Sequence, residues 1–131
     1  MTYNYDDSSF KNTDLYKNFI SENPSFGFLK VRAYMAGGAV PVSDLNVVIS
    51  KNIDGAKVIF FDGVTDSSGV IESIKLPAPI LDSNLDVPNR TKYDVVASYG
   101  DFKYFSIVNI FENIIVVQNI NVTPTNFMGG L

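Results

Sequence analysis

Three acidic side chains fall close together in the sequence, at Asp62, Asp66 and Glu72. Their carboxylate oxygens are the ligand type that Ca²⁺ takes, but the ion needs about six to eight oxygens and this spacing fits no EF-hand loop. Solvated acids around one turn explain the same pattern. Paired carboxylates can also cleave glycosidic bonds, but only the presence of Asp and Glu points that way here. We therefore expect no metal site and no catalytic carboxylate pair.

The chain contains neither histidine nor cysteine. The absence of histidine removes the commonest general base, the commonest transition-metal ligand and the usual switch near neutral pH. The absence of cysteine removes thiolate zinc sites and thiol nucleophiles. We therefore expect a protein that is not an enzyme and takes no cofactor, and whose work is binding or assembly.

Length and charge narrow the class of partner. The 131 residues fit one domain, and a net charge of −4 with scattered Lys and Arg argues against nucleic acid. No apolar run reaches the roughly twenty residues of a membrane span. Residues 1–10 lack the basic and apolar regions of a signal peptide. We expect a soluble cytoplasmic protein that is later incorporated into a phage-like particle or a spore.

The composition changes twice along the chain. Residues 1–25 form a polar N-terminal extension, residues 26–124 are rich in Val, Ile, Phe and Tyr, and residues 125–131 form a short tail. Turn residues interrupt the middle part every eight to twelve positions or so, which is typical of a sandwich or barrel. We predict an all-β, antiparallel Greek-key sandwich of about seven strands, with a short N-terminal helix.

Alternation identifies the strands. In residues 26–36, apolar side chains recur at every second position, which predicts one buried and one solvated face. Pro77 and Pro79 are expected to end a strand over 70–76, because proline donates no ladder hydrogen bond. The other predicted strands cover residues 46–50, 57–61, 93–99, 103–108 and 114–122. The predicted buried core includes Leu29, Val31, Val47, Ile49, Val95 and Val116.

The order of short motifs resembles that of a known family. The motifs are GFLKVRAY (27–34), GAVPV (38–42), VVIS (47–50), TDSSG (65–69), LPAP (76–79), YDVVA (93–97) and NINV (119–122). Together they resemble the transthyretin-like, carboxypeptidase-regulatory-like domain found in clostridial spore cortex-lytic proteins and short stand-alone relatives. The resemblance implies a Greek-key sandwich, usually a non-catalytic one. A related branch of purine-pathway hydrolases depends on histidine, which this chain lacks.

The N-terminal extension contains one candidate helix. Thr13 can cap a helix over residues 14–22, in which Leu15 and Phe19, and Tyr16 and Ile20, form i,i+4 pairs. A helix shorter than about twelve residues is marginal alone in water, so it must pack on something. Three alternatives stay open: it covers the chain's own sandwich, it docks on a neighbouring subunit, or the segment is disordered.

These features lead to two hypotheses of function. The first is a non-catalytic structural or adaptor protein, built into a homo- or hetero-oligomeric assembly through its two ends. A phage tail, a related contractile particle or a spore-surface layer would be such an assembly. The partner-binding residues predicted under this hypothesis are Phe10, Leu15, Tyr16, Phe19, Ile20, Phe127, Met128 and Leu131. The second is an accessory module that binds cell-wall glycan, which predicts a cluster of exposed tyrosines with polar neighbours.

Overall fold

A computed structural model of the chain describes residues 1–123. After β1 (Thr2–Asn4) come two helices, α1 (Ser8–Lys11) and α2 (Asp14–Glu22). The rest of the described chain consists of β2 (Ser25–Met35), η1 (Ala36–Gly38), β3 (Val40–Pro41), β4 (Asn46–Ile53), β5 (Ala56–Val64), β6 (Val70–Ala78), β7 (Thr91–Tyr99), β8 (Phe102–Ile110) and β9 (Ile115–Asn121). Neither helix of this part has the length and apolar character needed to cross a membrane.

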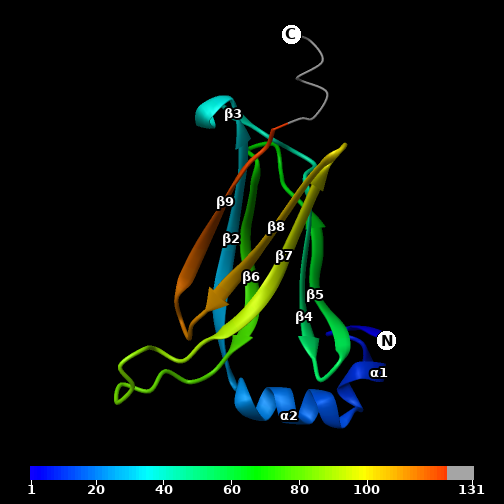
Figure 1. The fold of residues 1–131 in the computed structure, drawn as a ribbon, viewed down its shortest axis with the longest axis vertical. Coiled ribbons are helices and arrows are strands. Elements are labelled where there is room, and N and C mark those ends of the chain that lie inside the picture. The colour runs from blue at the N-terminus through cyan, green and yellow to red at the C-terminus, as the bar shows by residue number, and fades with distance from the viewer. Residues whose placement is uncertain (124–131) are drawn as a thin grey trace.

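The strands form two facing sheets, so the predicted all-β sandwich is confirmed (Figure 1). One sheet has five strands in the order β1-β5-β4-β7-β8. The other has four, in which β2 pairs with β3 and β6 and, along its opposite edge, with β9. The strand pairings are antiparallel as predicted, apart from β1 with β5 and β2 with β9, which are parallel. β9 runs parallel to β2 because the chain crosses from β8 in one sheet to the edge of the other.

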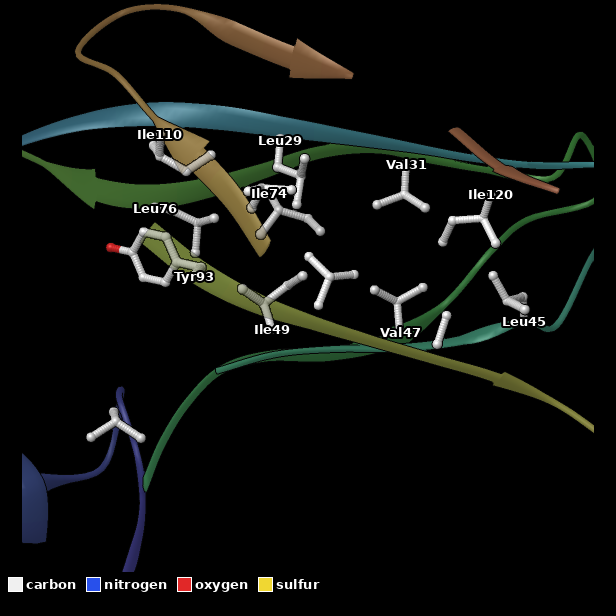
Figure 2. Close-up of a cluster of buried hydrophobic side chains, with 14 of the residues drawn as sticks. Leu29, Val31, Leu45, Val47, Ile49, Ile74, Leu76, Tyr93, Ile110 and Ile120 are labelled. Carbon is white, nitrogen blue, oxygen red and sulfur yellow. The ribbon is translucent and has the colours of Figure 1, made fainter. Parts of the chain in front are cut away.

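The core lies between the sheets, where alternate side chains of facing strands meet (Figure 2). Leu29 and Val31 from β2 face Val47 and Ile49 from β4, and all four are fully buried. Val95 is also fully buried, so five of the six predicted core residues are confirmed. The sixth residue, Val116, packs against the core but is only partly buried, so the prediction of full burial is wrong for it. It belongs to the edge strand β9, whose fully buried residue is Ile120.

β6 runs two residues further than predicted and ends directly before Pro79. The strand continues to Ala78, and Pro77 pairs with Phe26 of β2. β6 is an edge strand here, so one side of its backbone has no strand to bond and a missing amide hydrogen is tolerated.

The N-terminal segment closes one end of the sandwich, where Figure 1 shows both helices. α2 begins after Thr13, whose hydroxyl oxygen accepts a 3.2 Å hydrogen bond from the Tyr16 amide, as the predicted cap requires. At its other end, Asn23 accepts a hydrogen bond from the Thr91 hydroxyl at the start of β7. The helix therefore packs on the chain's own sandwich, the first of the three alternatives.

Candidate interaction surface

The predicted attachment residues of the N-terminal segment lie mostly inside the protein. Phe10 and Phe19 are 0% and 5% exposed and belong to the core, while Leu15 and Tyr16 pack partly buried against it. Ile20 is half-buried. The prediction that Phe10 and Phe19 bind a partner is therefore corrected: both side chains stabilise this chain. Phe127, Met128 and Leu131 lie outside the described residues.

An aromatic cluster explains why the segment packs inward. The Tyr5 ring stacks on Phe60 of β5 with centroids 4.6 Å apart, and the Phe10 ring meets Tyr16 edge-on at 5.6 Å. β1 also pairs in parallel with β5, and this pairing provides hydrogen-bond partners for part of the β1 backbone. Burial raises the pKa of the Tyr5 phenol to about 12. The segment thus finds its apolar pocket within its own chain.

The three acidic residues singled out in the sequence each have a structural role. Asp66 accepts hydrogen bonds from the Ser68 and Val70 amides at 2.9 and 3.0 Å, which holds the turn before β6. Asp62 accepts one from Asn46 across the β4–β5 pair, at 2.9 Å. Glu72 lies 3.3 Å from the Lys30 ammonium. Among residues 1–123 no three acidic side chains come together as metal ligands would.

Exposed apolar side chains also lie on β8 and β9, the two edge strands of one flank, which we call the open flank and define by Phe105, Ile107, Ile115 and Val117. Their exposed fractions are 74%, 63%, 67% and 46%. The first two belong to β8, the last strand of the five-stranded sheet, and the other two to β9, at the edge of the second sheet. β8 and β9 contact each other along this flank (Figure 1). Both sheet edges are therefore open on the same side of the molecule.

The sequence of β8 produces this exposure. Its even-numbered residues, such as Val108 and Ile110, are buried between the sheets, and Tyr104 accepts a 2.7 Å hydrogen bond from the Gln118 amide of β9. Phe105 and Ile107 fall on the opposite face, where polar residues are usual. Sequence reasoning missed them, although residues 102–110 are apolar at both odd and even positions. That two-sided pattern is the signal that could have identified them.

The apolar surface continues from β8 across the outer face of the five-stranded sheet. Val48 pairs with Val96, and Val96 pairs with Phe105, so the three side chains form one row across β4, β7 and β8. A hollow of about 720 Å³ beside this row is lined by Phe105 and Ile107, and also by Lys51 and Asp94. The outer face at β8 is therefore apolar at its centre and charged at its margin.

The long loop between β6 and β7 is joined to the same flank. Glu112, in the turn between β8 and β9, accepts a 3.1 Å hydrogen bond from the Leu81 amide of this loop. Hydrogen bonds from the Ser25 side chain and from Leu81 hold the pKa of the Glu112 carboxyl below its usual range. The loop also exposes Ile80 and Val87, so it adds apolar surface next to β9.

A polar cleft of about 650 Å³ lies at the start of β7 and is lined in part by residues of α2. Lys51, Arg90 and Lys92 line it together with Glu22 and Asp54, so positive and negative groups are mixed. The Lys51 ammonium already donates a 2.9 Å hydrogen bond to the Lys92 carbonyl, and burial lowers its pKa. Arg90 likewise donates a 3.2 Å hydrogen bond to the Pro88 carbonyl. Because the cleft mixes charges of both signs and exposes little apolar side chain, we place the candidate interaction surface on the open flank.

Comparisons with known proteins bear on the fold alone. No protein-family model matches the chain, and no curated protein matches it by sequence. A solved structure of 5-hydroxyisourate hydrolase from Klebsiella pneumoniae is similar with a TM-score of 0.47 and 14% identity, over 75% of this chain and 92% of the hydrolase. Catechol 1,2-dioxygenase from Acinetobacter sp. ADP1, inhibited by bound mercury, is similar with a TM-score of 0.48 and 10% identity, over 93% of this chain and 56% of the dioxygenase. Likenesses this distant say nothing of what the chain binds. The β-sandwich rests on the strand pairing above, and the transthyretin-like assignment stays a prediction.

Proposed function

We propose that the chain is a non-catalytic structural or adaptor protein that joins a larger protein assembly through its open flank. The observation that supports this is the exposure of Phe105, Ile107 and Ile115 on two adjoining edge strands. An edge strand presents unpaired backbone amides and carbonyls, and exposed apolar side chains beside it gain free energy when a partner covers them. The contact surface is thus a sheet edge rather than the N-terminal arm expected from the sequence.

The distribution of polar groups supports the same function. Asp62, Asp66 and Glu72 each bond within the chain, and the sequence contains no histidine or cysteine. Nucleophilic or acid–base catalysis needs a group of shifted pKa beside a substrate. Whether the assembly is a phage tail, another contractile particle or a spore layer stays a prediction.

The glycan-binding alternative lacks a supporting observation. It predicts a cluster of exposed tyrosines, but Tyr93 is buried and five others are half-buried, which leaves only Tyr99 exposed. Stacking on a sugar needs an open aromatic face. We therefore keep assembly as the single proposed function.

The test is incorporation into an assembly. The chain is expressed together with its neighbouring genes and the lysate is fractionated on a density gradient. We expect the chain to sediment far above its 14.4 kDa mass, and a Phe105→Glu/Ile115→Glu variant to stay at the top of the gradient. Val64→Glu changes an exposed valine on β5, away from the flank, and should sediment like the wild type. A chain that sediments alone, or that instead pellets with purified peptidoglycan, would contradict the proposal.

A further inference from the structure

The free edge of β8 is regular enough to accept another strand. β7 and β8 form a hairpin closed by a two-residue loop, Gly100 and Asp101, with Gly100 at φ +58° as a type II′ turn requires. Their pairing runs from Tyr99↔Phe102 to Thr91↔Ile110 without a register shift. In such a hairpin the closing pair is hydrogen-bonded and every second pair follows. The even-numbered residues of β8 therefore bond to β7, and the odd-numbered ones direct their amides and carbonyls to the open edge.

The side chains at those odd positions have the same order of polar and apolar types in both directions along the strand. From one end to the other they are Lys103, Phe105, Ile107 and Asn109, which is polar, apolar, apolar, polar. An antiparallel copy of β8 reverses the order, so apolar residues meet apolar ones and polar meet polar. In the exposed residues of β9 the order is two apolar and then two polar: Ile115, Val117, Asn119 and Asn121. An antiparallel pair of β9 strands would set apolar residues against asparagines, so β8 is the edge suited to self-association.

We propose that two copies of the chain pair through β8, antiparallel, to form one continuous ten-stranded sheet. Phe105 of each copy lies opposite Ile107 of the second copy, Lys103 lies opposite Asn109, and the two Ser106 residues face each other at the two-fold axis. Cross-strand pairs of aromatic and β-branched residues are among the more favourable ones. This inference rests on the proposed function, because it names a second copy as the first partner at the open flank.

Charge and edge length favour a pair rather than a longer array. The register places no like charges opposite each other, since the one charged side chain within β8 that faces outward is Lys103. The far edge of the five-stranded sheet is β1, which is only three residues long, and short edge strands resist further addition. Each copy has a net charge of −4, so salt should strengthen the association by screening repulsion.

The first test measures mass in solution. Sedimentation equilibrium of the full chain, from about 1 to about 200 µM, covers the affinities expected of a modest interface. We expect a dimer of twice 14.4 kDa whose fraction rises with concentration. Phe105→Lys should abolish the dimer over this range, because an ammonium would face Ile107 of the second copy. The control Val64→Lys changes an exposed valine on β5, outside the open flank, and should leave the dimer intact.

The second test fixes the register. The chain has no cysteine, so an engineered thiol is the only one in each molecule. Residues facing each other at a non-hydrogen-bonded pair have Cα atoms about 4.5 Å apart, within disulfide range. Ser106→Cys should therefore oxidise to a covalent dimer. Lys103→Cys should not, because six residues of strand, about 20 Å, separate the two thiols in this register.

Two results would overturn the inference. One is a wild-type chain that stays monomeric at every concentration. The other is a dimer that persists in Phe105→Lys, or that cross-links through Lys103→Cys as readily as through Ser106→Cys. Neither result would contradict the proposed function, which the density-gradient experiment tests separately. A monomer that enters a large assembly would still be a structural protein.

Discussion

The Tyr93 hydroxyl donates a 2.6 Å hydrogen bond to the Pro77 carbonyl oxygen. Tyr93 belongs to β7 in the five-stranded sheet and Pro77 to β6 in the other, so the bond joins the two layers across the core. Tyr93 is 1% exposed, and burial raises its pKa far above that of a free phenol. Its ring also meets Phe60 edge-on at 5.0 Å, which links the core to the aromatic cluster of the N-terminal segment.

Removal of this hydroxyl should destabilise the fold without changing its shape. In Tyr93→Phe the buried Pro77 carbonyl loses its partner, which costs about 1–3 kcal/mol. Urea denaturation should show a lower midpoint with an unchanged m-value. Tyr99→Phe removes a hydroxyl from an exposed tyrosine and should shift the free energy of unfolding by less than about 0.5 kcal/mol. Equal effects of the two substitutions would show that the cross-layer bond contributes nothing.

The N-terminal segment should be indispensable for stability. Phe10→Ala leaves a cavity in the core where the ring was fully buried, and we expect a loss of about 3–5 kcal/mol. Deletion of residues 1–22 should leave a chain without cooperative thermal unfolding, because it removes both Phe10 and Phe19. Lys11→Ala, next to Phe10 but exposed, is the control and should unfold like the wild type. A truncated chain with the wild-type melting temperature would contradict this packing.

Raising the pH above 10 should lower the free energy of unfolding. The pKa of Tyr5 is raised from 10.0 to about 12, chiefly by burial and further by Tyr16 and Asp6. The folded state therefore holds this phenolic proton more tightly than the unfolded state. The resulting stability is complete below pH 10 and is lost as the pH rises from 10 to about 12. Tyrosinate absorbance should show late-titrating groups, and Tyr5→Phe should reduce both that late phase and the fall in stability.

The sequence was a good guide to strands and a poor guide to what lies at their edges. Alternation in residues such as Leu29, Val31, Val47 and Ile49 identified the two facing layers, because a period of two is a local property. It did not reveal that β9 runs parallel to β2, since strand partners are chosen by contacts far apart in the chain. The partial exposure of Val116 follows from that edge position.

The site was harder to predict than the fold, for a related reason. Phe10 and Phe19 were expected to need a partner's pocket because their neighbours in the sequence are polar. Tyr5 packs against both rings, and Phe60, some forty residues beyond Phe19, packs against Phe19. Conversely, Phe105 was expected to be an ordinary strand residue, and only the sheet order shows that β8 has no outer neighbour. Exposure depends on topology, which short motifs do not contain.

The turn before β6 provides a last, sharper test of the fold. Gly69 has φ +74°, in the left-handed region, and a Cβ there would overlap the Ala33 carbonyl oxygen. That same carbonyl accepts a 3.0 Å hydrogen bond from Val42, while the Ala33 amide donates to the Gly69 carbonyl at 2.7 Å. Gly69→Ala should therefore force β2 and this turn apart, in addition to the left-handed strain of about 1–2 kcal/mol.

Gly55, in the turn between β4 and β5, separates the two effects. It has a similar positive φ of +89°, but no atom lies within 4 Å of the position its Cβ would take. Gly55→Ala should therefore cost only the backbone strain, about 1–2 kcal/mol in chemical denaturation. Gly69→Ala should cost clearly more, because strain and overlap add at that site and the displaced backbone belongs to β2, at the centre of its sheet. Equal losses for the two variants would mean that the turn moves freely and that the contact with Ala33 does not hold β6 against β2.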